Sequence, residues 1–353
     1  MKTLFTDILT VWYSQKKRDL PWRNTKDPYK IWISEIILQQ TRIQQGLSYY
    51  QRFIEEFISI SELSKAPEEK VLKLWQGLGY YSRARNLHFT AKIVQEKFNG
   101  NFPDKYREII TLKGIGSYTA AAIASICFEE AIPVIDGNVF RFISRYLGLE
   151  VAYDNPRAKK EIYAFLEKEI VYATPSVFNQ ALMEMGALVC TPANTKCTEC
   201  PFKATCNAFR ENKVLEIPQS KKTAEILHRY FTYFIFRYQG NDDFCTLIKQ
   251  RTEKDIWKNL FEFPLLETKN TPSQLELNDF LLKFISDYKE PIVLSNHEIK
   301  HQLSHQLLHV NFTIITIKPN FLNEYTEIDF NKFNTYAVSA LINKILEKSN
   351  LSS

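Results

Sequence analysis

Residues 111–126, TLKGIGSYTAAAIASI, read as the end of one helix, a tight hairpin at Lys113–Gly116 and a second helix rich in alanine. The two glycines permit the turn and leave free backbone N–H groups at the start of the second helix. A helix start of this kind binds phosphate through its geometry and its dipole together. A Gly-x-Gly sequence between helices is also often only a turn. The candidate phosphate-binding residues are Lys113, Gly114, Gly116 and Ser117.

A second segment, PVIDGNVFR (133–141), follows the alanine-rich helix and places Asp136 directly before Gly137 and Asn138. An aspartate at this distance from a helical hairpin supports a functional role of the hairpin more strongly than its two glycines do. A helical hairpin followed by an aspartate at this distance resembles the core motif of the helix-hairpin-helix glycosylase superfamily, and this resemblance implies that Asp136 and Asn138 are candidate catalytic residues.

Four of the six cysteines lie in one segment, CTPANTKCTECPFKATC (190–206). The ligand candidates, spaced Cys-x6-Cys-x2-Cys-x5-Cys, are Cys190, Cys197, Cys200 and Cys206. Tetrathiolate sites hold zinc or an iron–sulfur cluster. Zinc ribbons usually bring two Cys-x2-Cys pairs from separate hairpins, and this segment has one such pair. The spacing therefore favours a cluster over zinc, and either metal site over two disulfides.

Length and composition indicate an intracellular enzyme with more than one domain. The 353 residues suggest about two domains, and hydrophobic residues make up 45% of the chain, which is ample for buried cores. The net charge of +5 allows a polyanionic partner without requiring one. The chain shows no signal-peptide pattern and no apolar stretch long enough to span a bilayer. We therefore expect a cytoplasmic protein without a membrane segment.

The residue pattern of the sequence changes after the cysteine segment. Residues 1–212 have apolar residues three and four apart, which predicts helices. Residues 213–229 read as a polar linker, and residues 230–353 contain β-like stretches at 230–238, 244–250 and 309–318. Helical stretches near 273–288 and 335–348 interleave with these strands. The expected architecture is an all-α domain joined to a smaller α/β domain.

The hairpin, the following aspartate and the uneven cysteine segment together resemble the endonuclease III superfamily of helix-hairpin-helix DNA glycosylases. The resemblance implies that the four cysteines bind a structural 4Fe–4S cluster that faces DNA. Bifunctional members carry a lysine at the position of Tyr118, and this lysine forms a Schiff base with the sugar. Because tyrosine cannot form an imine, the sequence predicts a monofunctional glycosylase that leaves the strand intact.

A second carboxylate, Glu35, lies in DPYKIWISEIILQQTRIQQ (27–45), on a predicted helix face with Ile31 and Leu38. An acid on an apolar face lies in the core or in a cleft, where desolvation raises its pKa and favours the protonated form. Such a group suits general acid catalysis. A glutamate paired with an internal arginine would give the same pattern.

The string WISEIILQQT (32–41) closely resembles the catalytic helix of the adenine DNA glycosylases of the MutY family. The resemblance implies that Glu35 protonates adenine N7 and that Asp136 stabilises an oxocarbenium-like sugar, with Tyr118 and Asn138 in support. This division between an acid and a carboxylate is the one that glycosidases use.

Further resemblance to this family covers most of the helical domain. DLPWR (19–23) and FNQALMEMGALVC (178–190) correspond to the adenine pocket and supply Trp22, Arg23, Gln180 and Glu184. For Glu184 a helix ion pair is an equally good interpretation. QGLGYYSRARNL (76–87) resembles the loop that wedges into DNA, which implies that Gln40 and Tyr80 enter the duplex while adenine is flipped out.

The C-terminal part resembles the Nudix-like domain with which the MutY family recognises 8-oxoguanine. LFEFP (260–264) and HQLSH (301–305) resemble two sequence motifs of that domain. Leu303 stands where the family usually has phenylalanine, whereas Ser304 and His305 remain to contact the lesion. The overall prediction is an all-α helix-hairpin-helix domain with a 4Fe–4S loop, followed by an α/β Nudix-like domain.

We therefore expect a monomeric, nucleoid-associated enzyme that removes adenine opposite 8-oxoguanine or guanine in double-stranded DNA. Its protein partners are not predicted. One alternative is an oxidised-pyrimidine glycosylase and AP lyase of the endonuclease III type. Another is a Nudix pyrophosphohydrolase or a nonenzymatic DNA-binding module. An active Nudix box is disfavoured, because Gly240 is the only glycine beyond Leu215.

Overall fold

The computed structural model describes residues 5–153, 155–219, 225–240, 243–286, 294, 298–320, 322–349 and 351. The chain forms two compact units. The first unit comprises Met1–Lys65 and Asn86–Lys222, and the second comprises Ala66–Arg85 and Thr223–Ser353. The limits predicted from the sequence, 1–212, 213–229 and 230–353, stay a prediction.

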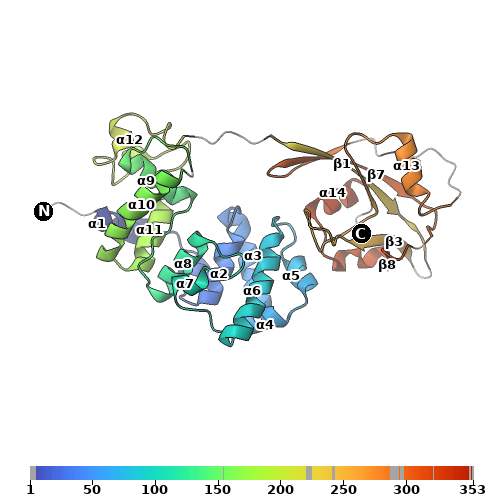
Figure 1. The fold of residues 1–353 in the computed structure, drawn as a ribbon, viewed down its shortest axis with the longest axis horizontal. Coiled ribbons are helices and arrows are strands. Elements are labelled where there is room, and N and C mark those ends of the chain that lie inside the picture. The colour runs from blue at the N-terminus through green and yellow to red at the C-terminus, as the bar shows by residue number, and fades with distance from the viewer. Residues whose placement is uncertain are drawn as a thin grey trace. The chain divides into compact units, whose positions relative to one another are not determined.

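The first unit is helical (Figure 1). Its main helices are α1 (Phe5–Lys16), α2 (Pro28–Ile37), α3 (Ile43–Glu56), α4 (Ile60–Lys65), α6 (Ser82–Phe98, which begins in the second unit), α7 (Tyr106–Ile109), α8 (Ser117–Phe128), α9 (Gly137–Leu147), α10 (Pro156–Glu169), α11 (Pro175–Leu188) and α12 (Asn207–Arg210). A short 3-10 helix, η1 (Pro21–Arg23), connects α1 to α2, and another, η2 (Ile170–Tyr172), follows α10.

Helix α8 is the central element of the first unit. Its residues from Thr119 to Ile126 are all buried, and it packs against α2, α7 and α11. Alanine suits this place because it is the best helix former and its small side chain lets neighbouring helices approach closely. The alanine-rich stretch thus explains why α2 and α11 can both lie against α8 and bring their side chains to one site.

Local signals in the sequence set where the helices start and stop. Asp27 caps α2, with a proline at the first helical position, and its side chain accepts a hydrogen bond from the N–H of Tyr29. Asp136 caps α9 in the same way. That helix ends at Gly148, whose φ of +75° is the left-handed conformation that glycine adopts without strain.

The described residues of the second unit form two four-stranded sheets, and α5 (Glu68–Leu74) belongs to the same unit. The first sheet has the order β5 (Leu265–Thr268), β1 (Leu227–Phe236), β7 (Gln306–Ile315) and β6 (Ile299–Gln302). The second has the order β2 (Tyr238–Gln239), β3 (Phe244–Gln250) and β4 (Phe261–Glu262), with β8 (Thr326–Asp329) paired to β3. Strands β1 and β7 are parallel over ten residues each, from Leu227 opposite Gln306 to Phe236 opposite Ile315.

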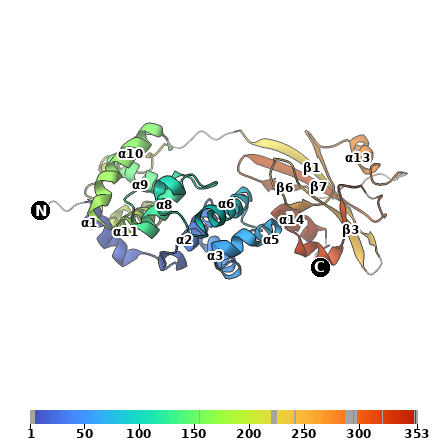
Figure 2. The same ribbon diagram turned by 60° about the horizontal axis from the view of Figure 1, so that its bottom comes forward.

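Helices cover both faces of β1, which lies in the middle of its sheet (Figure 2). Phe231, Tyr233 and Ile235 pack into one buried cluster together with residues of α14 (Ala340–Lys348). Phe234 and Phe236 pack into a second cluster with residues of α13 (Gln274–Leu281). Because successive strand residues point to opposite faces, a strand covered on both sides is continuously apolar.

The predicted strands at 230–238, 244–250 and 309–318 are confirmed as β1, β3 and β7, with ends shifted by a few residues. The two predicted helices are shorter than expected. Helix α13 ends at Leu281, and α14 starts only at Ala340, after its Ser339 cap, because Phe330–Thr335 forms a 3-10 helix. Within the described ranges, no helix is both long and apolar enough to cross a bilayer.

Candidate active site

A cavity of about 220 Å³ in the first unit gathers the residues that the sequence assigned to catalysis and to the adenine pocket. Its walls come from η1, α2, α8, α9 and α11. All eight of these predicted residues line it, namely Trp22, Arg23, Glu35, Tyr118, Asp136, Asn138, Gln180 and Glu184. Their positions in the chain span residues 22 to 184, so the fold alone brings them together.

Glu35 lies in the middle of α2 with only 9% of its surface exposed. Burial raises the pKa of its carboxyl group from 4.5 to about 7; a hydrogen bond from Tyr118 opposes this shift, and the charge of Asp136 adds to it. At neutral pH a substantial fraction of Glu35 is therefore protonated. A neutral acid in a cavity can give its proton to a leaving group.

Tyr118 is the second residue of α8 and lies next to Glu35. Its hydroxyl is 3.1 Å from the sulfur of Met183 on α11. Burial and the nearby charges of Glu35 and Asp136 raise the pKa of Tyr118 well above its ordinary value. The phenol therefore stays protonated and can hydrogen-bond to Glu35 in either protonation state of the carboxyl group.

Asp136 is the N-cap of α9, and its carboxylate is held by two donors. Its Oδ1 accepts from the N–H of Val139 at 2.7 Å, and its Oδ2 accepts from Nδ2 of Asn138 at 2.8 Å. Burial raises the pKa of Asp136 above its ordinary value, while these hydrogen bonds and Arg141 work in the opposite direction. Asn138 is itself fixed, since its Oδ1 accepts from Arg141 at 2.9 Å.

Glu184 is bound by two arginines from the N-terminal segment. Arg18 donates to it through its backbone N–H and its side chain, at 2.5 to 2.9 Å. Arg23 donates at 2.9 and 2.5 Å. Burial favours the neutral acid, but these hydrogen bonds prevail and lower the pKa of Glu184 to about 2. The open question about Glu184 is thus answered in part: it forms ion pairs, though with residues outside its own helix.

Trp22 from η1 and Gln180 from α11 complete the wall of the cavity. Trp22 is buried and packs edge-on against Tyr50, with ring centroids 5.2 Å apart. Oε1 of Gln180 accepts a hydrogen bond from the hydroxyl of Tyr13 at 3.2 Å. The flat indole and the amide are suitable contacts for a planar base.

Sequence reasoning missed Arg18, Met183 and Tyr13. Arg18 belongs to the run KKRDLPWR, which looks like a solvated charged segment, whereas two arginines of this run, Arg18 and Arg23, pair with the buried Glu184. Met183 lies one residue before Glu184. Its spacing from the other apolar residues is that of an ordinary core methionine on a helix. The structure shows that the carboxylate at 184 is buried, and a buried carboxylate needs a cation nearby; the sequence alone does not show this burial.

The predicted phosphate-binding residues lie together at the hairpin before α8. Helix α7 ends at Ile109, somewhat earlier than the sequence suggested, and Gly116 is the N-cap of α8. Gly114 has a φ of +81°, and a Cβ atom there would lie 2.6 Å from Cβ of Asn86. A Cβ atom on Gly116 would meet no atom within 4 Å. The hairpin therefore needs a glycine at 114, whereas the space around Gly116 is open.

The two predicted wedge residues have unusual backbone conformations. Gln40 has a φ of +56° and Tyr80 a φ of +47°, both in the left-handed region. Such a conformation is uncommon for residues other than glycine, and strained residues of this kind often mark functional sites. Both side chains are exposed. Gln40 belongs to the first unit and Tyr80 to the second.

In the second unit, Tyr80 lies with the predicted lesion-reading residues Leu303, Ser304 and His305 around a cavity of about 510 Å³. The hydroxyl groups of Tyr80 and Ser304 are in direct contact. Ser304 and His305 are exposed, and Leu303 is half-buried against the core of the unit. The structure thus brings Tyr80, a predicted wedge residue, and the HQLSH segment to the same cavity.

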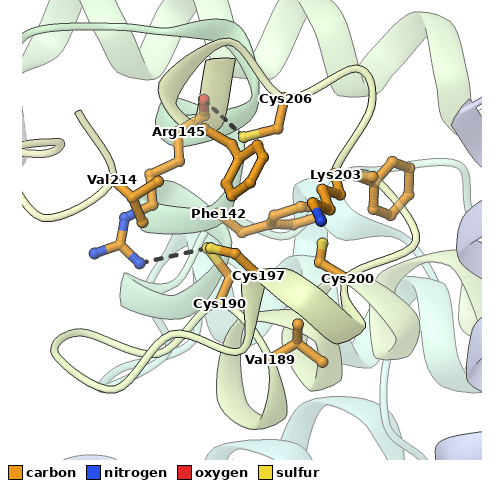
Figure 3. A pocket seen from close by; sticks show the side chains of 11 residues that line it. Phe142, Arg145, Val189, Cys190, Cys197, Cys200, Lys203, Cys206 and Val214 are labelled. Carbon is orange, nitrogen blue, oxygen red and sulfur yellow. Dashed lines mark hydrogen bonds between the residues drawn. The ribbon is translucent and has the colours of Figure 1, made fainter. Parts of the chain in front are cut away.

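The four clustered cysteines surround a small cavity in the first unit (Figure 3). Arg145, which is buried, contacts two of them: its Nη1 lies 3.5 Å from Sγ of Cys190, and its carbonyl oxygen lies 3.4 Å from Sγ of Cys206. Its guanidinium group also donates to the carbonyl groups of Thr191, Pro192 and Ile217. All four thiols are free in the structure.

Comparisons with known proteins agree with this arrangement. Residues 33–169 match the HhH-GPD superfamily of base excision DNA repair proteins, and residues 232–348 match the NUDIX domain. An adenine DNA glycosylase of Buchnera aphidicola subsp. Baizongia pistaciae is 37% identical over 99% of this chain and 97% of its own length. An adenine DNA glycosylase of Arabidopsis thaliana is 31% identical over 85% of this chain and 54% of its own length.

Solved structures show the same fold for the helical part. A thermostable thymine-DNA glycosylase superposes with a TM-score of 0.54 at 27% identity, covering 59% of this chain and 95% of that one. Endonuclease III, solved as a trapped covalent intermediate with DNA, superposes with a TM-score of 0.51 at 20% identity, covering 59% of this chain and 94% of that one.

The fold and the site thus define a helix-hairpin-helix DNA glycosylase with a Nudix-like second domain. The chain belongs to the family of adenine DNA glycosylases, which are hydrolases that act on N-glycosyl bonds. The fold class, the family and the enzyme class predicted from the sequence are confirmed.

Proposed function

We propose that this protein hydrolyses the N-glycosidic bond of adenine that lies opposite 8-oxoguanine or guanine in double-stranded DNA, and so starts base excision repair. The observation that carries the proposal is the pair of carboxyl groups in one cavity: Glu35, with a pKa of about 7, and Asp136, held by two hydrogen-bond donors. Two acids in different environments are what a glycosidic cleavage needs.

Each carboxyl group has a distinct role. Glu35, when protonated, donates its proton to a ring nitrogen of adenine, so that the base leaves as a neutral molecule. Asp136, when ionised, faces the positive charge that develops on the sugar as the bond breaks, and fixed charges of this kind act strongly in a cavity from which water is excluded. Tyr118 and Asn138 orient the two carboxyl groups.

The cavity supports hydrolysis without strand cleavage. Among the described residues that line it, none is a lysine. A Schiff base with the sugar needs an amine nucleophile, and Tyr118 occupies the position at which the bifunctional relatives carry one. A water molecule, or a covalent ester with Asp136 that water then opens, would complete the reaction.

The residues outside the catalytic cavity would hold the DNA. The hairpin at Lys113, Gly114, Gly116 and Ser117 offers N–H groups to a phosphate. Gln40 and Tyr80 would fill the space left by the flipped adenine, which offsets part of the cost of unstacking it. Leu303, Ser304 and His305 would read the base opposite, and the shared cavity of Tyr80 and Ser304 supports this role.

Members of this family generally carry a 4Fe–4S cluster, and the cysteine segment fits one. Cys190, Cys197, Cys200 and Cys206 line one cavity beside the buried cation of Arg145, and four thiolates are the usual ligands of such a cluster. Within the part of the chain that the structure describes, no three His, Cys, Asp or Glu side chains converge to hold a single metal ion. The cluster would tie the loop together as a structural element. We further propose that the protein acts as a cytoplasmic monomer, associated with the nucleoid through DNA.

The test is to incubate the protein with duplexes that carry one adenine opposite 8-oxoguanine, guanine or thymine, and to measure free adenine and strand breaks separately. We expect adenine to be released opposite the first two bases, the strand to break only after alkali, and borohydride to trap no protein–DNA adduct. Release of an oxidised pyrimidine together with a trapped adduct would support the lyase alternative instead.

A variant tests the lesion-reading role. Ser304→Ala should reduce the ratio of the rates opposite 8-oxoguanine and guanine several-fold, because a hydrogen bond to the lesion is lost. Thr252→Ala, which alters an exposed residue of the same unit, is the matched control and should leave the ratio unchanged.

A further inference from the structure

Tyr13 does not line the catalytic cavity, yet it contacts two residues that do, Gln180 and Arg23. We propose that Tyr13 is a positioning residue that fixes which end of the Gln180 side-chain amide is offered to the base. This inference rests on the proposed function, because it assigns a task to the pocket in which the adenine would be bound.

The first observation is the hydrogen bond between α1 and α11. Tyr13 is 6% exposed, and its hydroxyl donates to Oε1 of Gln180 at 3.2 Å. An amide has an acceptor end and a donor end. Because Oε1 is occupied by Tyr13, Nε2 is the end that remains. In the described chain Nε2 of Gln180 has no protein partner, so it is available to a ligand.

The second observation is that Tyr13 is itself held in place. The guanidinium group of Arg23 lies over the phenol ring, 5.7 Å from its centroid, and the same group binds Glu184. A cation over an aromatic face is attracted to it. Tyr13 is thus clamped between the Arg23–Glu184 ion pair and Gln180, and it cannot turn away from the amide without breaking this packing.

The third observation concerns the proton of Tyr13. Burial raises the pKa of its hydroxyl above the ordinary value; the charge of Arg23 opposes the shift and that of Glu184 adds to it. The phenol therefore keeps its proton at neutral pH, so it can donate that proton to Oε1 as the geometry indicates, which a phenolate could not do. The pocket accordingly offers the base an N–H donor, which fits a ring nitrogen of a purine.

If Tyr13 loses its hydroxyl, the amide of Gln180 can rotate and present either end. Substrate binding then loses the selection that Tyr13 provides, whereas the two carboxyl groups of Glu35 and Asp136 are unaffected. The expected signature is weaker binding at an almost unchanged maximal rate. A general loss of folding would instead weaken binding and also lower the maximal rate.

The experiment is a double-mutant cycle on the full-length protein with Tyr13→Phe, Gln180→Ala and both together. Single-turnover rates of adenine release are measured against enzyme concentration, with adenine opposite 8-oxoguanine. Each single variant should raise the half-saturating concentration about 5- to 10-fold, as expected for one hydrogen bond, with the maximal rate within about twofold. The double variant should be no weaker than Gln180→Ala, because both changes remove the same interaction.

Tyr172→Phe removes the hydroxyl of an exposed tyrosine and is the control, which should match the wild-type protein. Thermal unfolding of every variant shows whether Tyr13→Phe is folded; if it is not, Tyr13→Leu, which also removes the donor and keeps an apolar side chain, takes its place in the cycle. Independent, additive effects of the two changes would overturn the role of Tyr13 while leaving the proposed function intact. Absence of adenine release by the wild-type protein would overturn both.

Discussion

Arg18 and Glu184 are joined by three hydrogen bonds, one from the backbone N–H of Arg18 and two from its guanidinium group. The carboxylate is almost completely buried, with 1% of its side chain exposed, whereas Arg18 keeps 34%. Since Arg23 binds the same carboxylate, two cations from the N-terminal segment depend on a single anion of α11.

Replacing Glu184 by alanine should therefore destabilise the first unit. The change leaves Arg23, whose side chain is only 12% exposed, without a counter-ion, and breaking a buried ion pair from one side typically costs about 3 kcal/mol or more. Urea unfolding monitored by circular dichroism would measure the loss. Glu96→Ala, at an exposed site of α6, is the control. A loss no larger than that of the control would show that the arginines do not need Glu184.

The rate of adenine release should depend on pH through Glu35. Its carboxyl group has a pKa of about 7 because it is buried, and only the protonated form can donate. The maximal single-turnover rate should therefore fall as the pH rises through about 7, and the descending limb should be missing from the residual activity of Glu35→Gln. A rate that stays constant between pH 6 and pH 8.5 would contradict the assignment of Glu35 as the acid.

The raised pKa of Glu35 predicts that replacing Glu35 increases the stability of the folded protein at high pH. The folded state binds the Glu35 proton more tightly than the unfolded state, whose carboxyl group titrates near 4.5. Ionisation of Glu35 therefore costs stability as the pH rises from about 4.5 to about 7, after which the cost is constant. Glu35→Gln should be more stable than the wild-type protein at pH 8, by on the order of 3 kcal/mol at most. The difference should vanish near pH 4, and an equal difference at both values would argue against a raised pKa.

The two glycines of the hairpin should respond differently to alanine. Gly114 has a left-handed backbone and a close neighbour in Asn86, so Gly114→Ala should cost about 1–3 kcal/mol and weaken DNA binding. Gly116 has a φ of −87° and free space around it, so Gly116→Ala should retain the stability of the wild-type protein. Thermal unfolding of the pair, with a DNA-binding titration, makes the comparison. Equal losses for both would mean that the turn geometry is not the reason for Gly114.

Residues whose role is encoded by short-range pattern were predictable from the sequence. Glu35 is buried because its helix face is apolar, and Asp136 caps α9 because an aspartate before a glycine and an asparagine favours a helix start. The four cysteines come together because they lie in one short segment. These features need no knowledge of which helices pack against each other.

What the sequence did not reveal depends on contacts between distant segments. The ion pairs of Arg18 join residues that are 166 positions apart, and nothing in a charged run near the N-terminus indicates a buried partner on α11. The parallel pairing of β1 with β7 likewise joins residues that are far apart in the chain, such as Leu227 and Gln306. The positive φ values of Gln40 and Tyr80 are set by the turns that hold these residues. Neither position has a glycine, which would have indicated a left-handed backbone.

The central claim, that Glu35 and Asp136 release adenine as acid and stabilising carboxylate, is tested most directly by single-turnover kinetics of Glu35→Gln and Asp136→Asn. The substrate is adenine opposite 8-oxoguanine, at saturating enzyme and pH 7. The account predicts fast release by the wild-type protein and a fall of about 100-fold or more in each variant, with DNA binding retained. Release by either variant at close to the wild-type rate would contradict it.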